Sequence, residues 1–269
     1  MRAIILAAGY ATRLYPLTLC IPKPLLKVTA DQAVIDFIVD DLAACGVRDI
    51  AVVTNRKFSG VFAAWARRAK GRCSGSLRLT VLDDGTTSND NRLGAVGDMY
   101  FAVKRQGAAD DLVVVGGDNL FDRGFRPFLA QARARGPHAS LGLFDIRDKK
   151  DATRFGVVSV DQQGRVVSFQ EKPLRPKTSC VATCLYFFPA ATLPLLKRYM
   201  ADPRTSKDAP GHYIRWLMQH DRVYGHALQE GRVFAEAVVC RPARVLPPGG
   251  EFHQNRFDLF GSHRSGPRQ

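Results

Sequence analysis

The sequence predicts an α/β protein in which a mostly parallel sheet is sandwiched by helices and extended by a smaller α+β portion. Three observations lead to this class. In the first half, apolar runs of strand length alternate with segments of helical period, which is typical of a parallel sheet covered on both faces. In the second half, two strand-like runs flank a short polar turn, which indicates a hairpin. The chain has 269 residues and is 46% hydrophobic, enough to bury a sizeable core.

The first half predicts a regular alternation of strands and helices. Apolar residues at 35, 38, 42 and 45 follow the period of a helix, and Gly46 stands where a helix would end. Two glycines, Gly94 and Gly97, weaken one of the other helices. Strands are expected at residues 3–7, 50–54, 77–82, 112–115 and 140–146, and helices at 34–45, 58–69, 91–104 and 125–135.

The second half changes character. Residues 155–161 and 165–169 flank the turn at 162–164 and predict the hairpin; a strand is expected at 181–188, and helices at 193–200 and 212–220. No Gly/Ser-rich linker separates the halves, so one domain is expected over residues 1–240, divided into parts 1–146 and 147–240. Residues 241–269 lose all apolar periodicity and predict a loose tail.

Charge and cysteine content exclude several other classes. The formal net charge is +14, but the basic residues are spread along the chain, which favours a phosphate-bearing small substrate over nucleic acid. The six cysteines are too sparse for a disulfide scaffold and match no zinc spacing, so we expect reduced core thiols. No apolar run approaches about 18 residues, and the apolar N-terminus is too short for a signal peptide. We therefore expect a cytoplasmic protein without membrane contact.

Two loops are expected at carboxyl ends of strands, where parallel sheets bind their ligands. They cover residues 9–23 and 116–122. Small residues in the first loop allow backbone N–H groups to approach phosphate oxygens, and Arg13 and Lys23 add two cations. The loop is neither a Walker A motif nor a dinucleotide fingerprint. On charge alone, a surface loop with two solvated cations explains it better than a phosphate site does.

The order of residues in the first loop resembles the signature of an enzyme family. The chain reads Leu6-Ala7-Ala8-Gly9-Tyr10-Ala11-Thr12-Arg13-Leu14-Tyr15-Pro16-Leu17-Thr18, then Pro22-Lys23-Pro24-Leu25. This resembles the sugar-1-phosphate nucleotidyltransferases, the glucose-1-phosphate thymidylyltransferase-like NTP transferases, over roughly residues 1–234. Ala11 stands where the family usually has a second glycine. A left-handed backbone at an alanine costs on the order of 1 kcal/mol.

The resemblance implies a Rossmann-like fold and an enzyme of nucleotide-sugar biosynthesis. Such an enzyme joins a nucleoside monophosphate from a nucleoside triphosphate to a sugar 1-phosphate and releases pyrophosphate. Residues 1–146 would bind the nucleotide, and residues 147–240 the sugar phosphate. The implied partners are those two small substrates; neither nucleic acid nor a membrane is expected, and a homo-oligomer is left open. The segment 84–95 occupies the position where the family reads the base.

The resemblance also implies roles for single residues. Asp118, at the end of the fourth strand, would hold Mg²⁺, which prefers one or two carboxylates together with phosphates and water. The implied catalytic residues are Arg13, Lys23 and Asp118. The implied nucleotide-binding residues are Leu6, Ala8, Gly9, Thr12, Arg13, Lys23, Leu93 and Gly94, and the implied sugar-phosphate-binding residues are Gly156, Glu171 and Lys172.

One departure from the family pattern concerns the second magnesium ligand. The family usually has Gly-x-Trp-Phe-Asp-Ile-Gly near the end, whereas this chain reads Gly231-Arg232-Val233-Phe234-Ala235-Glu236-Ala237. Ala235 therefore stands in the position of the aspartate. A shifted reading frame or a truncated gene explains this, and so does divergence towards weak activity or none. The alternative function is then a catalytically weak or inactive homologue that binds nucleotide-sugars. The base and the acceptor, whether a sugar phosphate or a phospho-alcohol, remain open.

Overall fold

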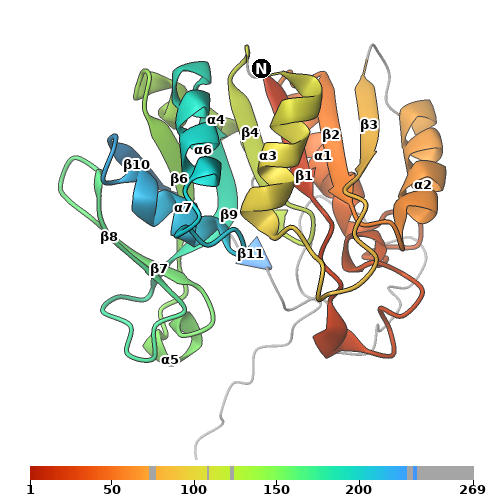
Figure 1. Ribbon diagram of the computed structural model, residues 1–269, viewed down its shortest axis with the longest axis horizontal. Helices are drawn as coiled ribbons and strands as arrows, with labels where there is room; N and C mark the ends of the chain where they lie inside the picture. The colour runs from red at the N-terminus through yellow and green to blue at the C-terminus, as the bar shows by residue number, and fades with distance from the viewer. Residues whose placement is uncertain (73–76, 108, 122–123, 229–232, 235–269) are drawn as a thin grey trace, which may run out of the picture.

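A computed structural model describes residues 1–72, 77–107, 109–121, 124–228 and 233–234 of the chain (Figure 1). Within these residues a large, mostly parallel sheet lies between helices, which confirms the predicted α/β class. The strands are β1 (Arg2–Leu6), β2 (Asp49–Thr54), β3 (Arg78–Asp83), β4 (Leu112–Gly116), β5 (Leu120–Phe121), β6 (Ala139–Asp145), β7 (Gly156–Val160), β8 (Val166–Glu171), β9 (Cys180–Phe188), β10 (Val223–Ala227) and β11 (Val233–Phe234). The helices are α1 (Val34–Ala44), α2 (Ser59–Arg72), α3 (Ala95–Gln106), α4 (Arg126–Ala134), α5 (Lys149–Ala152), α6 (Leu193–Ala201) and α7 (Pro210–Leu217), with short 3-10 turns at Thr12–Leu14, Lys23–Leu25 and Ala190–Thr192.

The main path of the sheet runs in the order β10-β6-β9-β4-β1-β2-β3. β1 is parallel to β2 and β4, β2 is parallel to β3, and β6 is parallel to β10. β9 is antiparallel to both of its neighbours, so among the described strands of this path it alone runs against the others. Leu6 pairs with Gly116 at the ends of β1 and β4, so the two predicted ligand loops leave the sheet side by side.

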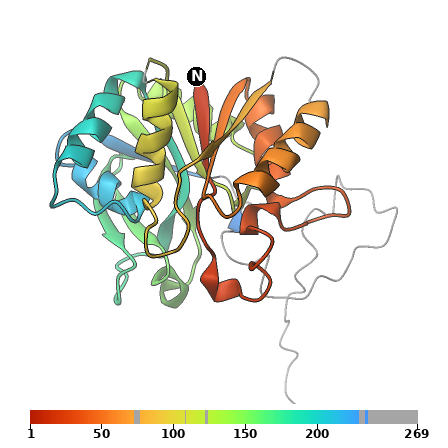
Figure 2. The same ribbon diagram turned by 45° about the vertical axis from the view of Figure 1, so that its right-hand side comes forward.

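Different helices cover the two faces of the sheet (Figure 2). Side chains alternate across a strand, and Ala3 and Ile5 of β1 pack in one core with α1, α2 and α4. Ile4, between them, packs in a second core with α3, α6 and α7. Both cores are fully apolar over the central strands, as the continuous apolar runs of the sequence predict.

The second half adds the predicted hairpin to this sheet. β7 and β8 are antiparallel, and β7 also bridges to β9 through Val157 and Val181. α7 packs against β8, and a small core of Ala152, Val157 and Val181 holds α5 in place. At the other end of this region, β11 pairs with β5 in a separate two-stranded sheet. The smaller portion thus lies beside the carboxyl end of β4 and the amino end of β9.

Most element bounds agree with the expectation, and the largest difference is at α3. The helix predicted at 91–104 begins only at Ala95, because Gly94 adopts a left-handed φ of 78° and stays outside it. α7 likewise begins at Pro210 and ends at Leu217, earlier than expected. The short elements α5, β5 and β10 were not predicted, since segments of two to five residues carry little periodicity.

Three further expectations can be compared with the described residues. Cys45, Cys180 and Cys184 are unpaired and partly buried, but Cys20 is an exposed loop residue, so the prediction of core thiols is wrong for Cys20. Within the described ranges, no helix is long and apolar enough to cross a membrane. The predicted loose tail, residues 241–269, lies outside the described residues.

Candidate functional site

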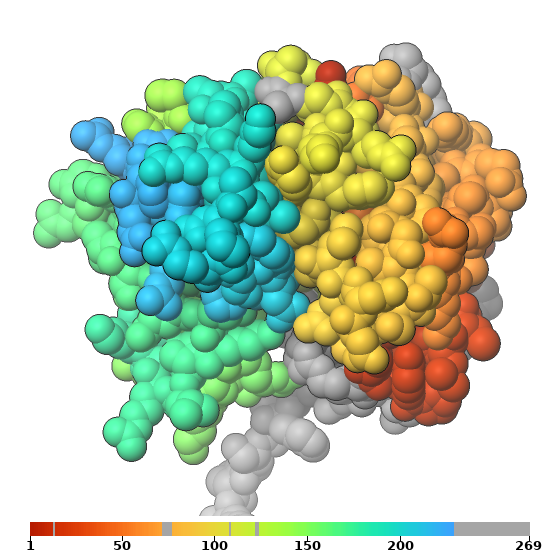
Figure 3. Space-filling view, in the orientation of Figure 1, coloured from red at the N-terminus to blue at the C-terminus, as the bar shows by residue number. Residues whose placement is uncertain are grey.

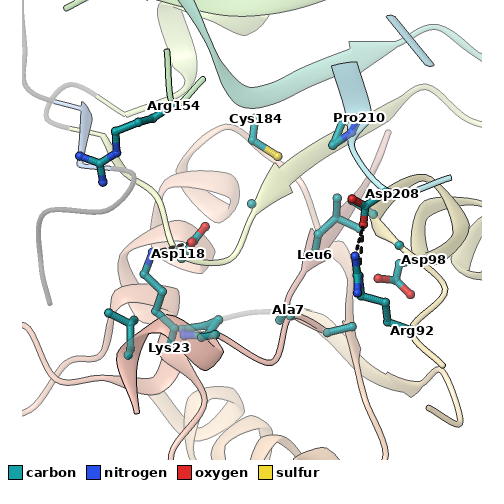
Figure 4. A pocket seen from close by; sticks show the side chains of 18 residues that line it. Leu6, Ala7, Lys23, Arg92, Asp98, Asp118, Arg154, Cys184, Asp208 and Pro210 are labelled. Atoms are coloured by element: carbon teal, nitrogen blue, oxygen red, sulfur yellow. Dashed lines mark hydrogen bonds and ion pairs between the residues drawn. The ribbon is translucent and has the colours of Figure 1, made fainter. Parts of the chain in front are cut away.

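A pocket opens where β1 and β4 end, at the place predicted for ligand binding. Its volume is about 500 Å³. Seven chain segments line it: the loop after β1, the 3-10 turn at Lys23–Leu25, the loop after β4, the start of α3, the start of α7, β9 at Cys184 and the turn after α5 at Arg154. Figure 4 shows Lys23 and Asp118 on one side of the pocket, Arg92 and Asp208 on the other, and Leu6 and Ala7 between them.

The loop after β1 is tied down by hydrogen bonds to neighbouring strands. The Ala7 N–H donates to the Val53 carbonyl at 2.9 Å, and the Gly117 N–H donates to the Leu6 carbonyl at 2.8 Å. The buried Asn55 amide donates to the Ala8 carbonyl at 2.9 Å. A Cβ added at Gly9 would meet no described atom within 4 Å. The loop therefore holds a fixed backbone next to open space, as a phosphate-binding loop requires.

Ala11 adopts the left-handed conformation that the family pattern implies for a glycine. Its φ and ψ angles are 47° and 40°. Its carbonyl accepts a hydrogen bond from the Thr18 hydroxyl at 2.8 Å, which holds the strained turn in place. Thr12 and Arg13 follow in the 3-10 turn at Thr12–Leu14. The side chain of Arg13 lies outside the described part of the structure, so its predicted role is untested.

Lys23 and Asp118 form an ion pair on one side of the pocket. Lys23 Nζ lies 2.7 Å from Asp118 Oδ2, and the two side chains are 13% and 39% exposed. The pair joins the two predicted loops across 95 residues of sequence. The structure therefore brings together two of the three predicted catalytic residues.

Asp118 is positioned by the residue that follows it. Asn119 is buried, and its side-chain amide donates to the Thr183 carbonyl of β9 at 2.6 Å. The Asn119 N–H also donates to the Gly116 carbonyl, which closes a tight turn after β4. Because this turn is anchored on both sides, the Asp118 carboxylate is held at the pocket wall.

The donor set at Asp118 suits a magnesium ion that also binds phosphates. Mg²⁺ takes one or two carboxylates and completes its shell with phosphate oxygens and water. In the described part of the chain, no group of three or more His, Cys, Asp or Glu side chains forms a metal site. Asp118 therefore fits a magnesium site that is completed by phosphate oxygens and water, and not a site made of protein ligands alone. Ala235, in the position of the second ligand, lies outside the described residues.

The predicted acceptor residues lie together on the smaller portion, beyond the pocket. Gly156 and Glu171 are directly paired across the β7–β8 hairpin. A Cβ at Gly156 would lie 2.5 Å from the Phe169 ring, and a Cβ at Gly211 would lie 2.1 Å from Glu171 Oε2. The space that these two glycines leave free is occupied by the side chains of Glu171 and Phe169.

Glu171 is a half-buried carboxyl with cations nearby. Burial raises its pKa, while the charges of Lys172 and His212 lower it and the charge of Asp208 raises it further. Lys172 is exposed, and its backbone is left-handed with a φ of 45°. Neither Glu171 nor Lys172 lines the pocket at Asp118. The residues predicted to bind the sugar phosphate therefore lie next to the pocket and not inside it.

The start of α3 is joined to the start of α7. The Ala95 and Val96 N–H groups donate to the carbonyls of Asp208 and Lys207, at 2.8 and 3.0 Å. Arg92 adds an ion pair with Asp208 at 3.0 Å. In Figure 3, α3 and the α6–α7 region meet side by side on one face of the molecule. Of the two predicted residues here, Gly94 lines the pocket, whereas the partly exposed Leu93 does not.

Sequence analysis missed several pocket residues. Asp98, Arg154, Cys184, Arg92 and Asp208 all line the pocket. The sequence could have pointed to Asp98, because it lies on the buried face of an amphipathic helix, where a carboxylate is unusual. Cys184 reaches the pocket because β9 is irregular between its pairs with Leu141 and Leu143 and the cysteine is left-handed there. Nothing in the sequence pattern marks such an irregularity.

Comparisons with known proteins place the chain among enzymes. The family model described as nucleotidyl transferase matches residues 2–233. A glucose-1-phosphate thymidylyltransferase from Neisseria meningitidis is 32% identical over 258 residues, which cover 88% of this chain and 83% of that protein. A glucose-1-phosphate adenylyltransferase from Trichlorobacter lovleyi is 28% identical over 246 residues, which cover 86% of this chain and 58% of that protein.

A solved structure is similar over nearly the whole fold. It is a candidate glucose-1-phosphate thymidylyltransferase from Bacillus anthracis in complex with a sucrose, with a TM-score of 0.71 and 22% identity. The similarity covers 89% of this chain and 92% of that chain. At this identity the similarity supports the fold alone, and it agrees with the predicted fold class.

Proposed function

The chain belongs to the nucleotidyl transferase family, and from this premise we propose that it is a sugar-1-phosphate nucleotidyltransferase. It transfers a nucleoside monophosphate from a nucleoside triphosphate to a sugar 1-phosphate and releases pyrophosphate. The observation that carries the proposal is the Lys23–Asp118 ion pair beside the open backbone of Gly9. A cation, a carboxylate and free backbone space at the ends of two parallel strands suit a magnesium-bound polyphosphate.

The reaction needs positioning and charge neutralisation more than a general base. An oxygen of the sugar phosphate attacks the α-phosphorus of the triphosphate in line. A new P–O bond forms, the bond from the α-phosphorus to the bridging oxygen breaks, and its electron pair leaves with pyrophosphate. Lys23, and Arg13 from the same loop, would offset the charge that develops on the phosphate oxygens. Magnesium held by Asp118 would supply further charge neutralisation at the phosphates.

The acceptor would bind at the adjacent site on the smaller portion. Glu171 can accept hydrogen bonds from sugar hydroxyls, and Lys172 can pair with the sugar phosphate. Gly211 lies directly against the Glu171 carboxyl and follows Pro210, which lines the pocket, so the two sites are contiguous. An acceptor held there can reach the phosphate side of the pocket.

The substrates to test first are those in the names of the relatives. Pyrophosphate release should be measured with dTTP, ATP, UTP, CTP and GTP against glucose 1-phosphate and other sugar 1-phosphates. The proposal expects turnover with at least one pair in the presence of MgCl₂ and none with EDTA. Binding of triphosphates without turnover of any pair would contradict it and would support an inactive binding homologue. No observation in the described residues favours that alternative.

Asp118→Asn tests the assignment of the metal ligand. The amide keeps the size of the side chain and can still bond to Lys23, but it loses the negative charge that Mg²⁺ requires. We expect a loss of turnover of about 100-fold or more, or roughly 3 kcal/mol in the transition state, with unchanged thermal stability. Asp31→Asn is the matched control, because Asp31 is exposed and lies outside the pocket. Near-full activity of Asp118→Asn would overturn the assignment.

A further inference from the structure

Two carboxyl groups lie together at the end of the pocket that the proposed reaction does not use. Asp84 follows β3, and Asp98 stands in the first turn of α3. Asp98 is only 7% exposed and lines the pocket. Figure 4 shows it beside Arg92 and Asp208, on the opposite side of the pocket from Lys23 and Asp118.

One oxygen of Asp84 is fully occupied by hydrogen bonds. Asp84 Oδ1 accepts from the N–H and from the hydroxyl of Thr86, both at 2.7 Å. The Thr86 hydroxyl in turn accepts from the Tyr10 hydroxyl at 3.3 Å. Asp84 is therefore fixed from two sides by the loop after β3 and the loop after β1.

Each of the two aspartates also has a buried oxygen without a donor. Asp84 Oδ2 and Asp98 Oδ1 are both buried, and neither finds a donor within the described ranges. Asp84 lies close enough for its charge, and a hydrogen bond to it, to favour a proton on Asp98. Two ionised carboxylates cannot form such a bond, which requires a proton on Asp98. Burial first and the charge of Asp84 next raise the pKa of Asp98 to about 8.

The charge of this pair restricts what can bind beside it. With a proton on Asp98 the pair carries about one negative charge, which repels phosphate groups and directs them to the Lys23 side of the pocket. The neighbouring wall consists of small or apolar residues, among them Leu6, Ala8 and Ala95. An uncharged, flat group that offers an N–H donor fits such a surface, and in a nucleoside triphosphate that group is the base.

Resting on the proposed function, we infer that Asp98, held by Asp84, determines nucleotide specificity by accepting a hydrogen bond from an N–H group of the nucleobase. Asp98 thus acts at the end of the pocket opposite to the phosphates. Its surroundings are Asp84 and the Tyr10 hydroxyl on the neighbouring loops, with the Arg92–Asp208 ion pair at the rim.

Calorimetric binding of ATP, dTTP, UTP, CTP and GTP tests this inference without requiring turnover. Wild-type protein should prefer one base, and Asp98→Ala should lose about tenfold or more of that preference, since a buried acceptor is removed. Affinity for inorganic pyrophosphate should stay unchanged, because pyrophosphate binds only at the Lys23 side. Asp31→Asn, the exposed control, should behave as wild type.

The Asp98→Asn variant separates recognition from mere packing. Its amide N–H can donate to Asp84 in place of the protonated carboxyl, while its oxygen still accepts from the base. We expect the base preference at pH 7 to persist, and the change in affinity that wild-type protein shows above about pH 8 to disappear.

Several results would overturn the inference. One is an unchanged base preference in Asp98→Ala; another is a preference that follows the ribose, seen as a large difference between a ribonucleotide and its 2′-deoxy form. If wild-type protein binds no triphosphate, the inference and the proposed function both fail. If it binds selectively but turns over no sugar phosphate, the proposed function fails and the inference stands.

Discussion

Three residues with side chains adopt a left-handed backbone around the two sites. They are Ala11, Lys172 and Cys184, with φ values of 47°, 45° and 54°. Such conformations cost on the order of 1–3 kcal/mol each, and they persist where the surrounding contacts enforce them. Hydrogen bonds enforce two of them: Thr18 bonds to the Ala11 carbonyl, and the Lys172 N–H donates to the carbonyl of Phe155.

Ala11→Gly should therefore stabilise the protein slightly, against the usual trend. Removing the Cβ relieves the strain of the left-handed backbone, which costs roughly 1–2 kcal/mol. The added conformational freedom of the unfolded chain opposes this and lowers the stability by about 0.4–1 kcal/mol. We expect a net gain of about 0.5 kcal/mol in the free energy of unfolding, measured by denaturant titration. Ala43→Gly, inside α1, is the control and should lose about 1 kcal/mol. Equal losses in both variants would contradict the conformation of Ala11.

Lys23 and Lys172 should serve different phosphates. Lys23→Ala should lower kcat/KM for the nucleoside triphosphate by about 100-fold, the effect of losing one charge-stabilising donor. Lys172→Ala should mainly raise the KM for the sugar phosphate. Lys27→Ala, an exposed lysine near the same loop, should leave both unchanged. Steady-state kinetics with each substrate varied in turn measures this, and identical profiles for the first two variants would refute the division.

At the residue scale, the sequence predicted the phosphate side of the site better than the rest. Lys23 and Asp118 stand in motifs whose order is informative, and the structure pairs them. Asp98 and Arg92 belong to the same pocket but were not predicted, because their roles depend on which segments α3 meets. That contact is made by residues more than a hundred positions later in the chain.

Among the elements, α3 shows how tertiary contacts fix a helix start. Its first N–H groups bond to carbonyls of the segment before α7 instead of to a capping side chain. Periodicity predicted the helix and its C-terminal half correctly. Its beginning was misplaced by four residues (91 expected, Ala95 found) because the partner that ends the loop is distant in sequence.

Gly94→Ala should break this junction. A Cβ at Gly94 would lie 2.4 Å from the Lys207 carbonyl oxygen, and the left-handed φ disfavours alanine as well. We expect a loss of roughly 2–4 kcal/mol in stability, from a backbone cost of about 1 kcal/mol or more and an overpacking cost of about 1–3 kcal/mol. Gly136→Ala shares the left-handed φ but meets no described atom within 4 Å, so it should show only the backbone cost. Equal thermal shifts in the two variants would exclude a tight junction.

For the whole molecule, the class of fold follows from the alternation of apolar runs and helices, but the sheet order does not. The apolar pattern of β9 is that of any buried strand, and nothing in it shows that β9 enters between β4 and β6 in the antiparallel sense. This placement joins the smaller portion to the main sheet through a strand that both share. It also brings Cys184 close to Asp118 and Glu171, between the two sites.

Titration of Asp98 should make the stability of the whole molecule depend on pH. The pKa of Asp98 in the folded state is about 8, raised from an ordinary 3.8 by burial and then by the charge of Asp84. Between these values the folded state binds a proton that the unfolded state has lost. The contribution of Asp98 to stability is therefore fully present below about pH 4 and falls as the pH rises towards 8. His226 acts in the opposite sense, since burial lowers its pKa to about 4 and its contribution is lost as the pH falls.

Comparison of Asp98→Asn with wild-type protein isolates the aspartate from His226 and every other group, because the variant cannot take up this proton. The difference in the free energy of unfolding, variant minus wild type, should grow with pH from about 4 to about 8 and then level off. The slope should be at most about 1.4 kcal/mol per pH unit, the value for one proton. Chemical denaturation at intervals of one pH unit measures it. If the two stability curves run parallel across this range, Asp98 is ionised in the folded protein, and the proton on which its recognition of the base depends does not exist.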